Sequence, residues 1–362
     1  MPESDKTRAR PFITSVIGAS IAGLLVSLSF GYSNHSPRPH HVPVDVVGPA
    51  VVVAHIRAGL DHAVPGGFNV VPATSVSAAR DRVLDQDAGG ALAVPPTGPT
   101  TILTASAGGS TLQQAVVSAL GAGSRALGRP ALVHDIAPLP ASDRSGLATY
   151  DFELGLLIPS VLVSLMLYLV GRTLRIWNRI GAASVFALLV AAVNVLAQYA
   201  IVGSLSTAPL AAYGIGALGA LTFVLFVIAC QAAVGLAGTA PAAVTLIFVG
   251  NALSGGPTPR WFLPDVYRQL SNWMPTSAIV RSLRSVVYFG GDGLGHPLLV
   301  LFVWSGVALF LIVAVDVLHV TELRHTSDSP PQVFAKSAVA HIRARRRRGR
   351  SDPTTGDLAS AS

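Results

Sequence analysis

Long uninterrupted runs of apolar residues dominate the chain and predict membrane-spanning helices. They cover residues 12–32, 154–171, 180–203, 209–231, 232–253 and 297–319. Each run is close to the length that a helix needs to cross a hydrocarbon core about 30 Å thick. Pro241 lies inside the fifth run and is tolerable because neighbouring helices or waters can satisfy the freed carbonyl. We therefore predict six transmembrane helices, one N-terminal anchor plus a bundle of five.

The first run has two readings. It follows Lys6, Arg8 and Arg10, as the apolar part of a signal peptide does. Residues 12–32 are longer than the apolar core of about 7–15 residues that signal peptides use, and residues 29–31 make a poor cleavage site. An uncleaved anchor is therefore the prediction, with a signal peptide as the alternative.

Between the anchor and the bundle, residues 33–153 show the shorter periods of a folded domain. Strands are predicted at residues 42–47, 91–94, 100–105 and 132–136. One helix aligns Val53, Ile56 and Leu60, and a second covers residues 75–84. Ser110 and Gln113 form a capping box for a third helix, which aligns Leu112, Val116 and Leu120. This order predicts a small α/β domain with a mixed sheet, in which residues 95–99 form a hairpin loop.

Residues 254–296, the second long segment between spans, predict two amphipathic helices at residues 264–274 and 276–288. Val280, Leu283 and Val287 share one face of the second helix, with arginines on the other face. Aromatic residues with arginines at a membrane boundary are typical of interfacial helices. The candidate interfacial residues are Trp261, Tyr267, Trp273, Arg281 and Arg284. The segment is either a surface-lying connector or a re-entrant gate.

Composition supports a membrane protein, and charge placement gives its orientation. Only 12% of the 362 residues are charged, against about 25% in soluble domains. The net charge of +7 is compatible with nucleic acid or anionic lipid as a partner. However, the basic residues concentrate in residues 6–10, 172–179 and 343–350, and six spans place all three segments on one side. The positive-inside rule makes that side the cytoplasm. The basic tail lacks the aromatic support that nucleic-acid binding needs, so membrane lipids are the expected partner.

These expectations define the predicted domains. They are a cytoplasmic N-terminus (1–11), a transmembrane helix (12–32), an inserted extracytoplasmic α/β domain (33–153), a five-helix transmembrane permease-like domain (154–319) with an outer loop (254–296), and a cytoplasmic, basic, disordered tail (320–362). The mainly α-helical protein is expected in the plasma membrane, multi-pass, with both termini cytoplasmic.

The familiar catalytic motifs are absent. The sequence holds no P-loop, HExxH, GxSxG or EF-hand pattern. Residues 214–219 match GxGxxG but lie in an apolar run, where small residues allow close helix packing. The single cysteine, Cys230, excludes an intramolecular disulfide. Asp45, His134 and Asp135 are loose candidates for an acid–base pair. We expect no enzymatic activity, no cofactor and no metal site.

Four polar residues lie within or at the ends of the predicted spans, where polar groups are functional candidates. Asn194 and Gln198 are four residues apart on one helix face, while Gln231 and Asn251 end the fourth and fifth spans. They either form hydrogen bonds between helices or line a substrate path.

Four stretches carry a family resemblance. They are residues 42–47; residues 78–84 with 90–94; residues 102–109 with 113–120; and residues 251–257 with Leu263-Pro264, 283–285 and 288–290. The chain resembles the type-2 ABC exporter permeases and is more similar to their relatives, the phage infection protein family. This resemblance implies a half-transporter that pairs as a homo- or heterodimer and works with a separate ATPase subunit. The cytoplasmic loops are short, unlike those of permeases that present a coupling helix.

Together these observations predict a permease-like subunit for export of a hydrophobic or amphipathic compound across the plasma membrane. The alternative is a non-transporting scaffold or receptor. Its extracytoplasmic domain binds a cell-envelope component or a partner protein.

Overall fold

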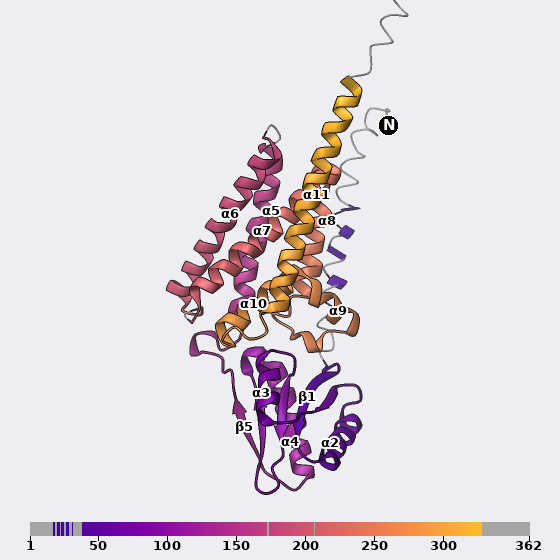
Figure 1. Ribbon diagram of the computed structural model, residues 1–362, viewed down its shortest axis with the longest axis vertical. Coiled ribbons are helices and arrows are strands. Elements are labelled where there is room, and N and C mark those ends of the chain that lie inside the picture. The colour runs from indigo at the N-terminus through magenta and orange to yellow at the C-terminus, as the bar shows by residue number, and fades with distance from the viewer. Residues whose placement is uncertain are drawn as a thin grey trace, which may run out of the picture. The chain divides into compact units, whose positions relative to one another are not determined.

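The computed structural model describes residues 38–171, 174–205 and 207–327, with scattered helical residues between 17 and 31 (Figure 1). For residues 319–327 only the backbone is described. Residues 1–313 form one compact unit and residues 314–362 a second. Most of the predicted anchor (12–32), the N-terminal segment (1–11) and most of the tail (320–362) lie outside the described residues.

A mixed five-stranded sheet forms in the first part of the chain. Its strands are β1 (Val42–Val47), β2 (Phe68–Pro72), β3 (Gly90–Ala93), β4 (Thr100–Thr104) and β5 (Ala131–Asp135), in the order β2-β1-β3-β4-β5. Strand β1 runs parallel to β2 and β3, β3 is antiparallel to β4, and β4 is parallel to β5. The four predicted strands are present with ends shifted by at most one residue. Strand β2 was not predicted.

Helices cover both faces of this sheet. Helices α2 (Ala50–Ala63) and α4 (Ser110–Ala126) share one apolar cluster with the inward valines of β1, and α3 (Val76–Leu84) packs on the opposite face. The predicted aligned residues of α2 and α4 are all buried. Helix α3 begins after Ser75, whose hydroxyl accepts a hydrogen bond from the Ala78 amide at 3.0 Å.

The predicted capping box of α4 is wrong. The residue before the helix is Gly109, with φ of 124°, and no side chain caps the helix. Gln113 donates to the Asp135 carboxylate at 3.2 Å instead. The Gln113 side chain, which the local sequence predicted to cap the helix, therefore makes a long-range hydrogen bond to β5.

Four helical segments in the described part of the chain are long and apolar enough to cross a membrane. They are Ala148–Leu169, Ile176–Val202, Pro209–Gly250 and Gly295–Leu318. The first is α5, and the second joins α6 (Ile176–Leu196) to the π-helix η4 (Ala197–Val202). The last lies within α11 (Gly295–Ser327).

The segment Pro209–Gly250 folds back on itself. Helix α7 (Pro209–Val234) ends at Gly235, which has φ of 68°, and is followed by η5 (Gly235–Gly238), α8 (Thr239–Ala243) and η6 (Val244–Gly250). The turn is tight, because a Cβ on Gly238 would lie 2.0 Å from the Cys230 carbonyl oxygen. Near its middle the segment contacts the far part of α5, through Gln231 and the Ser164 carbonyl. Just past its end it contacts the start of α5, through Asn251 and Tyr150.

The 254–296 loop contains η7 (Arg260–Phe262), α9 (Asp265–Trp273) and α10 (Pro275–Tyr288). The two predicted helices are therefore present. In α10 the polar face is buried as well as the apolar face, since Ser277, Ser285 and Arg284 are buried. Leu283 and Val287 belong to the core of the helical bundle, whereas Phe289 joins the cluster beneath α3. Helix α10 thus lies between the bundle and the sheet-containing part of the chain.

Candidate functional site

A small pocket lies where the 254–296 loop meets the sheet-containing part of the chain. The sheet side contributes residues that include Val83, Gln86, Ala88 and Leu112. The loop side contributes Gly255, Trp261, Phe289 and three arginines, Arg260, Arg281 and Arg284. Ser277 also lines it and shares a face of α10 with Arg281 and Arg284, at spacings of four and three residues. We call this site the arginine pocket.

Arg284 is the most deeply buried of these arginines. Its side chain is 6% exposed, and its two terminal nitrogens donate to the carbonyl oxygens of Gly255 at 2.9 Å and Gly256 at 3.3 Å. The remaining donor, Nε, is buried without a partner among the described residues. Burial lowers the pKa of Arg284 from its ordinary value. Arg284 lies on the face of α10 opposite its apolar face, as predicted, and this polar face lies against the sheet-containing part.

Arg281 is free of hydrogen bonds and ion pairs within the described part of the chain, although burial lowers its pKa. Arg260 donates to the Gln86 carbonyl at 2.5 Å and lies over the Trp261 ring, 4.4 Å from its centroid. Burial, together with the neighbouring Arg281 charge, lowers the pKa of Arg260 to about 9. Both guanidinium groups are therefore held where their charge is poorly solvated.

Among the residues that the structure describes, no acidic side chain lines the pocket. The ion pairs found among the described residues are Arg82–Asp45 and Arg268–Asp265, neither of which involves a pocket arginine. The exposed Asp87 attracts Arg260 and Arg281, and the buried Asp143 attracts Arg284, in each case at longer range than an ion pair. The site therefore holds an excess of positive charge, and an anion is the group that it can bind.

Two further contacts fix the loop around the pocket. At the end of α10, the Tyr288 hydroxyl donates to the buried Asp143 carboxylate at 2.5 Å. Burial and this hydrogen bond raise the pKa of Tyr288. The other oxygen of Asp143 accepts the Leu147 amide at 3.1 Å, next to the start of α5. One carboxylate thus joins the end of α10 to the first turn of α5.

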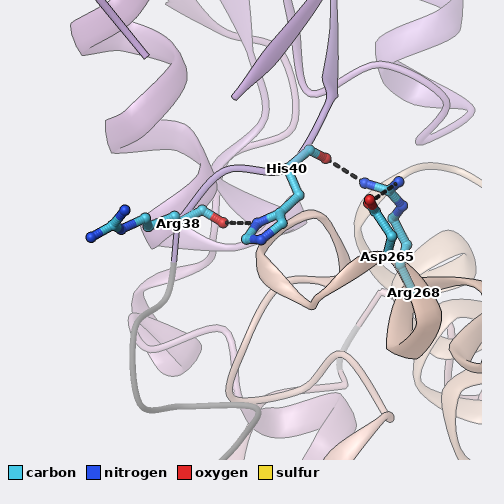
Figure 2. Close-up of polar contacts among 4 residues, drawn as sticks. All are labelled: Arg38, His40, Asp265 and Arg268. Atoms are coloured by element: carbon cyan, nitrogen blue, oxygen red, sulfur yellow. Dashed lines mark hydrogen bonds and ion pairs between the residues drawn. The ribbon is translucent and has the colours of Figure 1, made fainter. Parts of the chain in front are cut away.

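On α9, Arg268 donates to the His40 carbonyl and pairs with Asp265 at 2.7 Å, as Figure 2 shows. The same figure shows the His40 ring in contact with the Arg38 carbonyl at 2.7 Å. The His40 amide in turn donates to the Trp261 carbonyl at 2.9 Å. Hydrogen bonds of His40, just before β1, therefore attach this segment to both η7 and α9.

The predicted interfacial aromatics lie apart from one another. Trp261 lines the arginine pocket and Tyr267 packs beside the apolar cluster of Leu253 and Leu263. Trp273 is 56% exposed, and its carbonyl accepts the Trp304 indole N–H of α11 at 2.7 Å. Of the five predicted loop residues, the structure brings Trp261, Arg281 and Arg284 together.

The four polar residues of the predicted spans are not brought together. Asn194 donates to the Gly155 carbonyl of α5 at 3.0 Å, and Gln198 accepts from the Ser204 hydroxyl at 2.7 Å. Gln231 donates to the Ser164 carbonyl at 3.3 Å and to Thr239, while Asn251 accepts from the Tyr150 hydroxyl at 2.7 Å. Asn194, Gln231 and Asn251 therefore bond to α5, which favours helix packing over a shared path, whereas Gln198 bonds within the turn that follows its own helix.

Glu153 was missed by the sequence reasoning. It is fully buried near the start of α5, and neither carboxyl oxygen has a hydrogen-bond partner among the described residues. The Thr149 hydroxyl, one turn earlier, is also buried without a partner in that set. An acidic residue at the edge of a predicted span was the available signal, but the predicted domain boundary fell directly after it.

The loose acid–base candidates do not form a site. Asp45 lies on β1 and pairs with Arg82 of α3 at 2.6 Å. His134 and Asp135 lie on β5, which β3 and β4 separate from β1. A search of the described residues found no group of three or more His, Cys, Asp or Glu side chains able to hold a metal.

No family model, curated protein or solved structure matches this chain. The resemblance to type-2 exporter permeases and the phage infection protein family therefore stays a prediction from the sequence.

Proposed function

We propose that the protein is a permease-like subunit that exports a hydrophobic or amphipathic compound across the plasma membrane. The observation that carries this proposal is the joining of a bundle of membrane-length helices to a sheet-containing part through one continuous loop. The 254–296 loop contacts both, since α10 contributes to the core of the bundle and also lines the arginine pocket. A movement of the bundle would therefore reach a candidate binding site.

Six crossings are the topology that we propose. The segment Pro209–Gly250 has 42 residues, and a straight helix of that length would measure about 63 Å, twice the thickness of a hydrocarbon core. Its reversal at Gly235–Gly238 supports two crossings. With the predicted anchor at residues 12–32, the basic segments then share the cytoplasmic side, and the sheet and the 254–296 loop lie outside.

The exposed apolar surface of the bundle supports pairing. The membrane-length segments Ile176–Val202 and Gly295–Leu318 bury only 22% of their apolar windows. Lipid or a second membrane chain must cover the rest, and a homo- or heterodimer is the arrangement that we propose. Because the sequence has no P-loop, a separate ATPase subunit is the proposed energy source.

The experiment is purification in a mild detergent, followed by identification of bound proteins and an ATPase assay. In parallel, lipids and drugs exported by a strain lacking the protein are measured by mass spectrometry. We expect a bound nucleotide-hydrolysing partner and the loss of one exported amphiphile. The absence of any such partner, together with unchanged export, would refute the proposal.

A second candidate is a scaffold or receptor whose sheet-containing part binds an envelope component or a partner protein. It is favoured by the hydrogen bonds that Asn194, Gln231 and Asn251 make to α5, which hold these side chains between helices. The variant Asn194→Ala/Gln198→Ala separates the two candidates. A transporter should lose flux while keeping its fold, whereas a scaffold should keep its partner binding.

A further inference from the structure

We propose that the arginine pocket binds a phosphoryl group. The source is either the head group of a lipid-like amphiphile or a free phosphate anion, and the lipid source rests on the proposed export function. The binding groups are Arg281, Arg284 and Arg260.

The first argument is unpaired charge. Arg281 makes no hydrogen bond or ion pair with any described residue, and the buried Nε of Arg284 has no partner in that same set. A buried donor without a partner is costly, and a buried guanidinium more so. An anion in the pocket would supply acceptors to both groups and a counter-charge to all three arginines.

The second argument is the kind of anion. One guanidinium can satisfy a carboxylate through two parallel hydrogen bonds. Here Arg260, Arg281 and Arg284 line one site, and none of the described residues that line it is acidic. A phosphoryl group offers more oxygen acceptors and up to two negative charges, and arginine is a preferred ligand for it.

The third argument is size and surroundings. The pocket has a volume of about 40 Å³, room for roughly three waters. Sites for drug-sized ligands are about 300–1,000 Å³, so only a compact group fits inside. Leu112, Trp261 and Phe289 supply apolar lining beside the arginines. An amphiphile could therefore place its head group inside and leave its chains outside.

The experiment measures binding to the full chain, purified in an uncharged detergent. The probes are dioctanoyl phosphatidic acid, dioctanoylglycerol as its phosphate-free match, and sodium phosphate against sodium chloride at equal ionic strength. The test variant is Arg281→Gln, because the Arg281 side chain makes no hydrogen bond or ion pair with any described residue. The control variant is Arg144→Gln, since Arg144 is exposed and lies outside the pocket.

We expect binding of phosphatidic acid but not of dioctanoylglycerol. Arg281→Gln should weaken that binding about ten-fold or more, because a charge-assisted pair is lost. Arg144→Gln should bind as the wild type does. Binding of phosphatidic acid alone supports the lipid source, and equal binding of inorganic phosphate supports a free anion.

The proposal is overturned if neither phosphorylated probe binds, or if Arg281→Gln binds as tightly as the wild type. It is also overturned if Arg144→Gln loses as much affinity, which would indicate general attraction to charge. These measurements need no transport, so a failed export assay leaves them unchanged. Conversely, a pocket that binds nothing leaves the export experiment intact.

Discussion

Buried charge is handled in opposite ways in two regions of this molecule. In the sheet, the fully buried Asp45 of β1 pairs with Arg82 of α3 at 2.6 Å. In the arginine pocket, Arg281 and the Nε of Arg284 have no partner among the described residues. The sheet thus contains both members of its ion pair. The arginine pocket is lined by three arginines and by no acidic side chain among the described residues.

The difference separates a structural role from a binding role. A buried ion pair is costly to break, but both of its charges belong to the fold and it needs no ligand. Buried cations without ion-pair partners raise the free energy of the unliganded pocket. A bound anion would lower that free energy. The following variants test this comparison, from the largest expected effect to the smallest.

Arg284→Met should destabilise the protein most, by about 3 kcal/mol. Methionine fills much of the space but leaves the Gly255 and Gly256 carbonyls without their charged donor. The measurement is thermal unfolding in detergent. Arg281→Gln is the matched control and should not destabilise the protein, because it removes a cation that has no ion-pair partner among the described residues. Equal stability of Arg284→Met and the wild type would show that the hydrogen bonds of Arg284 to Gly255 and Gly256 do not stabilise the fold.

Arg82→Gln should cost about 2 kcal/mol at pH 7, less than a fully buried pair, because the Arg82 side chain is 38% exposed and therefore screened. Burial raises the pKa of Asp45, and the Arg82 charge lowers it in part. Without Arg82 the pKa rises further, so the folded variant holds its proton more tightly than the unfolded chain. Its stability deficit relative to the wild type should therefore be smallest at acid pH, where Asp45 is protonated in both folded proteins, and should grow as pH rises through the raised pKa of Asp45 in the wild type.

A double variant checks the cause of that deficit. Asp45→Asn/Arg82→Gln has no charge to bury, so its stability should show less pH dependence than that of Arg82→Gln. The measurement is the unfolding midpoint in denaturant at several pH values. A deficit in Arg82→Gln that is the same at every pH would show that lost packing, not unpaired charge, is responsible.

Glu153→Gln should have the smallest effect, within about 1 kcal/mol. The amide has nearly the shape of the carboxyl group, and neither carboxyl oxygen has a donor to lose among the described residues. Unfolding of the variant and of Glu153→Ala, which opens a cavity, should be compared. A loss of more than about 2 kcal/mol in Glu153→Gln would reveal a partner for this carboxyl group.

Local pattern was enough to predict much of the sheet-containing part. The valines of β1 alternate, and Val53, Ile56 and Leu60 recur at helical spacing, so burial follows directly from sequence. Strand β2 was missed because it directly follows Gly66-Gly67 and ends on Pro72, residues that are typical of turns. Its place is set by parallel pairing with β1, which is a long-range interaction.

The arginine pocket could not be predicted in the same way. Its lining joins residues near Val83 and Leu112 to residues near Arg260 and Arg281, far apart in the chain. The spacing of Arg281 and Arg284 correctly placed them opposite the apolar face of α10. It could not show that folded chain, instead of water or lipid head groups, covers that second face. Amphipathic spacing identifies a polar face but not what lies against it.

The tryptophans around the 254–296 loop have an optical consequence. The chain has four tryptophans, and Trp261, Trp273 and Trp304 all lie within the loop or bonded to it. Trp261 lies beneath the Arg260 guanidinium at the pocket wall. The intrinsic emission of the unlabelled protein is therefore weighted towards this one loop. An anion that shifted Arg260 would change the emission of Trp261, so occupancy of the pocket should be readable as fluorescence without any added dye.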